Sequence, residues 1–318
     1  MKKTLAAAFT FVGTVIGAGF ATGKEIYLFF SSCSIFSVLL AGGFLGLFCF
    51  VILQLSASFG SVFTSFAKLT VPVRIFVVFA NFSVFCATIA GSESVVNDLI
   101  GVRGGAVLIA FVTLAIVLVG VRYVQIVNVL IVPVLIALVL FVTLPGTHGD
   151  ISGKTSIVLP FSYASMNVVT GGFFLGETGK TFTKKQAVGC AILSGALLTA
   201  LLVCVYLSVK NVSAEMPFIE QADRLGYGVV GNVILLLAML TTAIGTLSVC
   251  VGKRKDLALP VVLLALVSSL FGFEKIVNTV YPVIGAVGGA ITVFMLIRWG
   301  MDARQRMGKK EMVRLRSP

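Results

Sequence analysis

The chain has 318 residues, of which 58% are hydrophobic and 11% are charged. Soluble domains are about 45–50% apolar and about 25% charged, so this composition excludes a soluble globular protein. The net charge of +12 does not indicate a nucleic-acid partner, because Lys and Arg lie between apolar runs and in the C-terminal tail, where they set membrane topology.

Long apolar segments follow one another along the chain and are separated by short polar or Gly/Pro-rich breaks. A helix that crosses a bilayer needs about 20 apolar residues. Ten segments meet this description: about 4–31, 35–58, 72–97, 104–121, 124–144, 156–178, 185–209, 227–251, 257–273 and 278–299. We therefore expect an all-α membrane protein with ten transmembrane helices.

The basic residues predict how these spans are oriented. If the N-terminus is cytoplasmic, alternation of the spans places most of the 24 Lys and Arg residues on the inner side. An excess of positive charge on cytoplasmic loops is the general rule for membrane proteins. We expect both termini in the cytoplasm, a bacterial inner-membrane location and a basic cytoplasmic tail at 301–318.

Ten spans divide into two halves of five, at 1–145 and 146–300. An odd number of spans per half gives the halves opposite orientations, which is the inverted-repeat plan of many secondary transporters. In that plan the first helix of each half is discontinuous. Spans 1 and 6 are therefore the places to look for interrupted helices.

Both spans carry residues that weaken a helix at mid-membrane. Span 1 contains GTVIGAGFATGKE (13–25) with four glycines, and span 6 contains YASMNVVTGGFFLGETG (163–179) with Asn167, Thr170 and Gly171 near its middle. Unwound backbone at this depth is tolerated only where protein or a watery cavity satisfies it, and it can bind an ion or a polar solute. The alternative is that these glycines allow helices to pack closely.

The run GTVIGAGFATGKE resembles the first-helix signature of the YkvI-like membrane proteins, and LAMLTTAIG (237–245) in span 8 adds to the resemblance. That group is related to the LeuT-type transporters of the amino acid–polyamine–organocation superfamily. The resemblance implies a five-plus-five inverted repeat with a solute site between spans 1, 3, 6 and 8. It also implies sodium coupling in many members and small solutes such as amino acids and amines.

The resemblance further implies one sodium site, formed by uncharged oxygen atoms. Its ligands would be the carbonyls of Gly13, Ile16 and Ala238 and the side chains of Thr241 and Thr242. The alternative for the two threonines is a hydroxyl that bonds back to its own helix. The superfamily's other sodium site uses an Asn where this chain has Phe20, so we expect one sodium site and no other cofactor.

The solute site implied by the resemblance combines broken backbone with nearby side chains. Its candidate residues are Gly17, Ala18, Gly19, Phe20, Glu93, Tyr163, Asn167, Thr170 and Gly171. Within this set, Phe20 and Tyr163 are candidate walls or gates. Span 3 (72–97) contains no Tyr of the kind that often contacts a substrate carboxylate, so an amino acid is the leading solute rather than an assigned one.

Charged residues inside apolar spans are functional candidates in general. Lys24 and Glu25 could form an external gate, contact a charged solute, or be an interfacial pair near a helix end. Glu93 could bind an amine, carry a proton, or lie near the outer headgroups. For Glu177, near Lys180, we expect a helix-end ion pair.

These observations favour a secondary active transporter that moves a small polar or amphipathic solute by alternating access, coupled to sodium. A proton-coupled transporter remains open through Glu25 or Glu93, and a channel or non-transporting membrane scaffold is the other alternative. The sequence contains no persuasive nucleophile–base pair or metal motif, so we do not expect an enzyme. It leaves the oligomeric state open.

Overall fold

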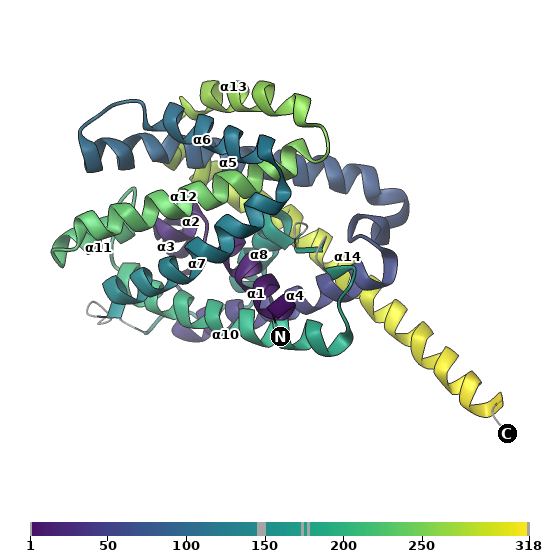
Figure 1. The fold of residues 1–318 in the computed structure, drawn as a ribbon. Coiled ribbons are helices and arrows are strands. Elements are labelled where there is room, and N and C mark those ends of the chain that lie inside the picture. Colours follow the sequence, from purple (N-terminus) through teal and green to yellow (C-terminus); the bar gives the residue numbers. More distant parts are fainter. Residues whose placement is uncertain (1, 145–150, 173–174, 177–178, 317–318) are drawn as a thin grey trace.

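The computed structural model describes residues 2–144, 151–172, 175–176 and 179–316, and nearly all of these lie in helices (Figure 1). The first part of the chain forms α1 (Lys2–Val15), α2 (Ala18–Ala21), α3 (Lys24–Phe30), α4 (Ile35–Phe59), a 3₁₀ helix (Phe63–Leu69), α5 (Thr70–Ile100), α6 (Gly105–Val119) and α7 (Val121–Thr143). The expected all-α class is confirmed.

The second part of the chain is also helical. It forms α8 (Val158–Asn167), a π-helical segment (Val168–Gly172), α10 (Lys184–Val209), α11 (Pro217–Arg224), α12 (Gly228–Val251), a 3₁₀ turn (Lys255–Leu257), α13 (Ala258–Ser269) and α14 (Phe273–Arg316). The expected boundary between the two halves, at 145 and 146, and the expected pair at Glu177 lie outside the described residues.

Several helices are long and apolar enough to cross a membrane. Among the described residues there are five: Ile35–Phe59, Thr70–Ile100, Lys184–Val209, Gly228–Val251 and Phe273–Gln305. Shorter apolar helices cover Lys3–Val15, Gly105–Val119 and Val129–Thr143. Together with the composition, they make this chain an integral membrane protein.

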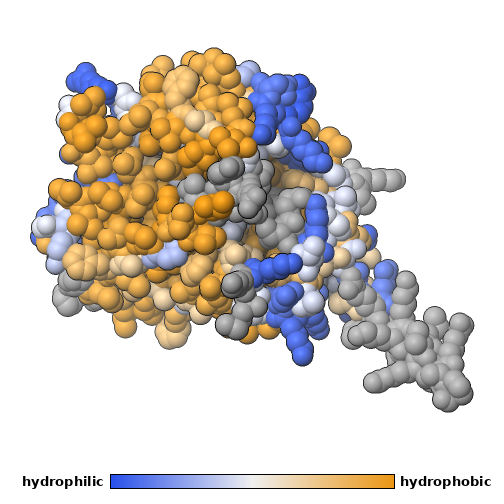
Figure 2. All heavy atoms as spheres, viewed as in Figure 1, coloured by the Kyte–Doolittle hydropathy of each residue, from blue (hydrophilic) through white to orange (hydrophobic). Residues whose placement is uncertain are grey.

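The molecular surface is that of a protein surrounded by lipid. Figure 2 shows a broad hydrophobic face, with hydrophilic residues mostly toward its margins. Large apolar side chains are widely exposed, among them Leu270 at 85% and Phe271 at 68%. Soluble monomers rarely expose contiguous apolar patches of this kind, so bilayer contact is their natural explanation.

The helices pack in pairs that are distant in sequence. The most extensive contacts are those of α10 with α4, of α12 with α5 and of α14 with α8. In the first pair the backbones approach closely, because a Cβ at Gly195 would lie 3.1 Å from the Cα of Gly46. Small residues at such a crossing are the usual means of close packing between membrane helices.

A short connection ties the start of the second half to the first. The amide of Ser34 donates to the Lys154 carbonyl at 3.1 Å, and the Lys154 amide donates to the Ser32 carbonyl at 3.1 Å. The Tyr206 hydroxyl of α10 donates to the Cys33 carbonyl at 2.7 Å. These bonds fix the turn between α3 and α4 against both halves of the chain.

The last helix is much longer than a bilayer is thick. Its 44 residues extend about 66 Å at 1.5 Å per residue. The helix therefore continues through residues 301–316, where we expected a solvated tail, and in Figure 1 it projects away from the bundle.

Candidate functional site

The first apolar segment consists of three short helices. At the end of α1 the amide of Gly17 donates to the Val15 carbonyl at 2.8 Å, instead of bonding four residues back. The next amide, of Ala18, leaves the main chain altogether and donates to the Thr242 hydroxyl at 3.0 Å. Gly23 then adopts a left-handed φ of 74°, which separates α2 from α3 and which glycine adopts without strain.

This turn leaves carbonyl oxygens without their helical donors. Within the part of the chain that the structure describes, no backbone amide donates to the carbonyls of Gly13, Thr14 or Ile16. Buried carbonyls are normally paired, and in a membrane an unpaired one is expensive. Such oxygens are therefore available to a cation or to a donor on a solute.

Helix α12 presents its hydroxyl groups to this turn. The Thr242 hydroxyl, which accepts from Ala18, also donates to the Ala238 carbonyl at 2.8 Å. The Thr241 hydroxyl donates to the same carbonyl at 2.9 Å. A Cβ at Gly17 would lie 2.9 Å from the Thr242 oxygen, so the glycine permits the close approach.

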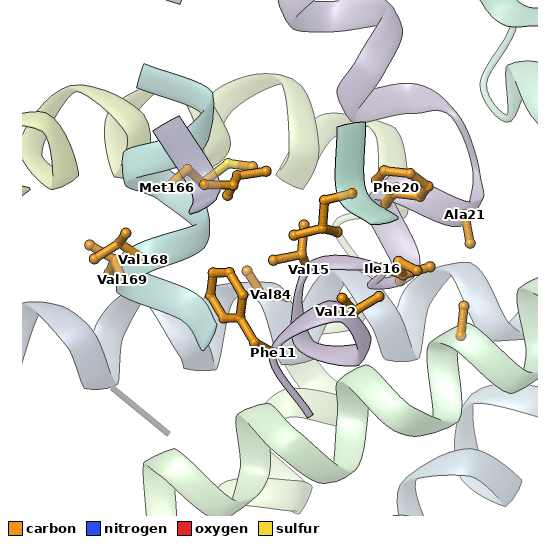
Figure 3. Close-up of a cluster of buried hydrophobic side chains, with 14 of the residues drawn as sticks. Phe11, Val12, Val15, Ile16, Phe20, Ala21, Val84, Met166, Val168 and Val169 are labelled. Carbon is orange, nitrogen blue, oxygen red and sulfur yellow. The ribbon is translucent and has the colours of Figure 1, made fainter. Parts of the chain in front are cut away.

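The sixth apolar segment changes from α-helix to π-helix at Val168. The Thr170 hydroxyl donates to the Met166 carbonyl at 3.1 Å, and the Asn81 side chain of α5 donates to the Val169 carbonyl at 3.3 Å. A π-helical turn disturbs the regular backbone ladder and is frequent at functional sites. Figure 3 shows the apolar residues of this junction, with Phe11, Val12, Val15 and Ile16 of the first segment, Val84 of α5, and Met166, Val168 and Val169 of the sixth.

A small cavity lies where these elements meet. Its volume is about 30 Å³, which accommodates one or two water molecules or a monatomic cation but not an organic solute. The first segment lines it with Thr14, Val15, Gly17, Ala18, Gly19 and Glu25. The remaining walls come from Met166, Asn167 and Thr170, from Thr241, Thr242, Gly245 and Thr246 of α12, and from Val84 and Tyr281.

The glycines of these runs have two different roles. At Gly13 a Cβ would collide with Val132 of α7, and at Gly171 it would lie 2.5 Å from the Thr14 hydroxyl, so these two permit close packing of segments. Gly17 and Gly19 also permit close approach, and in addition they line the cavity. The two interpretations that the sequence left open are therefore compatible with each other.

Glu25 is a buried carboxyl group that faces the cavity. It is 6% exposed, and its Oε2 atom has no hydrogen-bond partner among the described residues. A Cβ at Gly19 would collide with its other oxygen. The carboxyl group therefore lies directly beside Gly19 of α2, where a residue with a Cβ atom would leave no room for it.

Lys24 points away from Glu25 and joins three segments. Its ammonium group lies 2.7 Å from a carboxylate oxygen of Glu274 in α14 and donates to the Ala214 carbonyl at 3.0 Å. The Lys24 side chain is 8% exposed and that of Glu274 is 50% exposed, so the pair lies at the edge of the bundle. The ion pair therefore links α3 to α14 at this edge.

The expectation that Glu93 belongs to the solute site is corrected. Its two carboxylate oxygens accept the amides of Gly104 and Ala106, each at 2.9 Å, at the start of α6. The first amides of a helix have no intrahelical partner, and a carboxylate there also meets the favourable end of the helix dipole. Glu93 therefore caps α6 and does not line the cavity.

Removal of this cap should lower stability without changing solute binding. We expect Glu93→Ala to reduce the free energy of unfolding by about 1 kcal/mol, as for other helix caps, and to leave transport unchanged. The neighbouring Ser94→Ala, which removes an exposed hydroxyl bonded within its own helix, is the control. Thermal unfolding of the purified variants measures the difference; loss of solute binding in Glu93→Ala with unchanged stability would contradict the assignment.

The structure brings half of the sequence-predicted residues together around the cavity and leaves the other half outside it. Those that line the cavity are Gly17, Ala18, Gly19, Glu25, Asn167, Thr170, Thr241 and Thr242. Those that do not are Gly13, Ile16, Phe20, Lys24, Glu93, Tyr163, Gly171 and Ala238. Phe20 and Tyr163 are fully buried side chains, so in this conformation they are packing residues beside the site.

Seven residues that line the cavity were not predicted: Thr14, Val15, Val84, Met166, Gly245, Thr246 and Tyr281. Tyr281 lines the cavity from α14, and Thr246 lines it one turn beyond Thr242. The only sequence signal was the helical spacing of four between the two threonines. For Tyr281 no local signal distinguishes it from an interfacial tyrosine.

Comparison with known proteins agrees with this geometry. The chain is 22% identical over 329 residues to the uncharacterized membrane protein YkvI of Bacillus subtilis (strain 168), covering 92% of this chain and 94% of that protein. It superposes on the inward-facing structure of Mhp1 with a TM-score of 0.59 and 14% identity, over 93% of this chain and 75% of Mhp1. The chain has a LeuT-type fold. The resemblance to YkvI-like proteins and LeuT-type transporters, predicted from the sequence, is confirmed.

A second structure of Mhp1 supports the same fold. It is a closed conformation with bromovinylhydantoin bound, described as a nucleobase-cation-symport-1 family transporter. The chain superposes on it with a TM-score of 0.51 and 14% identity, over 93% of this chain and 71% of that one. No protein-family model matches the chain. These likenesses establish the LeuT-type fold for the chain, and what it transports is a separate question.

Proposed function

We propose that the protein is a secondary active transporter that moves a small polar or amphipathic solute by alternating access, coupled to sodium. The observation that carries the proposal is the turn at 16–17, where main-chain oxygens lose their helical donors beside the hydroxyls of α12 and a small cavity. In transporters with discontinuous helices, such half-helix ends bind the substrate and the coupling ion. The LeuT-type fold, shared with the transporter Mhp1, supports the same function and argues against an enzyme.

The arrangement of the helices supports ten spans in two inverted repeats of five. With the first span as α1 to α3 and the sixth as α8 and its π-helical continuation, each helix has a counterpart five spans later. Corresponding pairs then make corresponding contacts: α4 packs on α8 as α10 packs on α1, and α5 packs on α13 as α12 packs on α6. Shared packing of this kind is what a pseudo-two-fold repeat requires.

The oxygens near the turn fit a sodium ion. A hydroxyl group has two acceptor lone pairs, so Thr242 can keep its bond from Ala18 and still coordinate a cation. The carbonyls of Gly13 and Ile16 have no backbone donor within the described chain. A bound sodium ion would be coordinated by these oxygens and would hold α12 against the broken first segment. The position of the two helices would then depend on the ion.

The Lys24–Glu274 pair is the proposed outer gate, and its charges should be interchangeable. We expect Lys24→Gln and Glu274→Gln each to slow transport severalfold, and Lys24→Glu with Glu274→Lys to restore part of the rate. Because Glu274 is half exposed, Glu274→Gln should alter the free energy of unfolding by less than about 1 kcal/mol. Uptake by proteoliposomes and thermal unfolding measure the two effects; equal losses in the single and double variants would contradict a gate.

A ligand screen of the purified full-length protein tests the proposed function. Thermal unfolding is measured with a panel of amino acids and amines, in sodium chloride or choline chloride. We expect a solute that raises the unfolding temperature only in sodium, since a ligand bound to the native state stabilises it. Stabilisation that depends on pH instead of sodium would favour proton coupling, and no response to any combination would contradict a transporter.

The charge distribution supports a bacterial inner membrane with both termini in the cytoplasm. Most of the 24 Lys and Arg residues then face the inner side. The basic end of α14 would extend from the membrane into the cytoplasm, close to anionic lipid.

A further inference from the structure

The cavity and its surroundings contain more unpaired polar atoms than the sodium site explains. Three buried oxygens lack hydrogen-bond partners among the described residues: Oε2 of Glu25 and the hydroxyl of Tyr281, whose residues line the cavity, and the hydroxyl of Tyr163, a packing residue beside it. Each phenol lies near enough to the Glu25 carboxyl to interact with it electrostatically. None of the three belongs to the proposed sodium ligands, and together they form a separate polar cluster.

Among the residues that the structure describes, no Lys or Arg forms an ion pair with this carboxyl group. Lys24, the adjacent residue, is engaged with Glu274 and the Ala214 carbonyl. A carboxylate buried without a partner is strongly unfavourable in a low-dielectric interior, and such groups inside membranes usually mark a substrate or ion pathway. The charge of this group must therefore be relieved by a proton or by a cation that enters the cavity.

The chemistry around Glu25 matches a primary ammonium group. An ammonium has three donors and no acceptor, and the cluster offers three unpaired oxygens. The Tyr163 ring is held by Phe29 and Phe30, with ring centroids 5.5 and 5.2 Å away, so its hydroxyl is fixed in place. Tyrosine faces also attract cations, whereas a sodium ion would need more oxygen ligands than this cluster provides.

The adjoining walls would hold the rest of such a solute. Val84 and Met166 line the same cavity with apolar side chains. An amine with a hydrocarbon body would place its charged end on Glu25 and its body on these residues. The cavity of about 30 Å³ must widen to admit such an amine, and the conformational change of alternating access would widen it.

We propose that Glu25, with the hydroxyls of Tyr163 and Tyr281, binds the protonated amino group of the transported solute, so that the substrates are amines. This inference rests on the proposed transporter function and specifies its substrate class. Glu25 is then the counter-ion of the solute, and Lys24–Glu274 closes the path above it.

The test compares matched charged and neutral probes on the full-length protein. Benzylamine and n-butylamine are measured against benzyl alcohol and 1-butanol by thermal unfolding and by equilibrium binding in sodium chloride. We expect the amines to bind and the alcohols to bind at least about tenfold more weakly. The reason is that a hydrogen bond to a charged group contributes more binding free energy than a hydrogen bond between neutral groups. Equal binding of the alcohols would overturn the inference.

Variants assign the effect to Glu25. We expect Glu25→Gln to weaken amine binding by about tenfold or more and Tyr281→Phe to weaken it severalfold. Glu220→Gln, which alters an exposed carboxylate on α11, is the matched control and should bind amines normally. If Glu25→Gln does not fold, the inference is tested by the difference between amine and alcohol binding. This difference is measured in the unaltered protein and in Tyr281→Phe. Retained amine binding in a folded Glu25→Gln would overturn the inference.

Failure of this inference is distinguishable from failure of the proposed function. Neutral solutes that stabilise the protein in a sodium-dependent way would preserve the transporter and reject the amine. Absence of any response to solutes or to sodium would reject both.

Discussion

Thr242→Val is expected to abolish the sodium-dependent stabilisation of the protein and sodium-coupled transport. Valine has almost the shape of threonine but lacks the hydroxyl that accepts from the Ala18 amide at 3.0 Å and donates to the Ala238 carbonyl at 2.8 Å. The buried Ala18 amide would be left unpaired, which costs about 1–3 kcal/mol, and one sodium ligand would be lost. Thermal unfolding in sodium chloride and in choline chloride measures both effects.

A matched substitution separates loss of the site from loss of a hydroxyl group. Thr88→Val in α5 removes a buried hydroxyl that bonds to the Val84 carbonyl of its own helix at 2.8 Å and does not line the cavity. The sodium response of this control should equal that of the unaltered protein. A full sodium response in Thr242→Val would remove the sodium site from the account.

Gly19→Ala is expected to eliminate solute binding and to lower stability by about 1–3 kcal/mol, as overpacked buried sites do. The added Cβ would occupy the position of the Glu25 carboxylate. The side chain or α2 must move, and either movement displaces the group proposed to bind the solute. Unfolding and amine binding of the purified variant are the measurements.

Two further variants test the cause of this effect. Gly43→Ala in α4, where nothing lies within 4 Å of the new Cβ, should keep full binding. Its stability should rise by up to about 1 kcal/mol from helix propensity. Shortening the carboxylate in Gly19→Ala with Glu25→Asp should recover part of the stability. Normal amine binding by Gly19→Ala alone would show that Glu25 is not where the solute binds.

Local sequence features predicted the positions where the main chain departs from a helix. Four glycines within 13–25 mark the segment that the structure divides into α1, α2 and α3. The threonine pair of α12 was expected opposite this segment, and there Thr242 accepts a hydrogen bond from the Ala18 amide. These features are visible in sequence because backbone freedom and hydroxyl groups are properties of single residues.

What the sequence could not predict depends on packing between distant segments. Tyr281 and Glu274 meet residues of span 1 that lie about 250 positions away in the chain, as in the 250-residue separation of Lys24 and Glu274. Glu93 was misassigned because its role depends on two amides of the following helix, which look like ordinary Gly and Ala in the sequence. The role of such a residue depends on the direction of its side chain relative to other segments. A single sequence does not specify that direction.

The central claim is that the helix break in the first span is accessible alternately from each side of the membrane. Thiol labelling of the Thr14→Cys variant measures this accessibility most directly. The variant is made in a background without the six native cysteines and exposed in liposomes to a membrane-impermeant thiol reagent from either face. Phe48→Cys, at a buried position away from the cavity, is the control. We predict that the Thr14→Cys variant reacts from both faces, more slowly in sodium, and that the Phe48→Cys variant stays unlabelled. No reaction of the Thr14→Cys variant from either face would contradict the account.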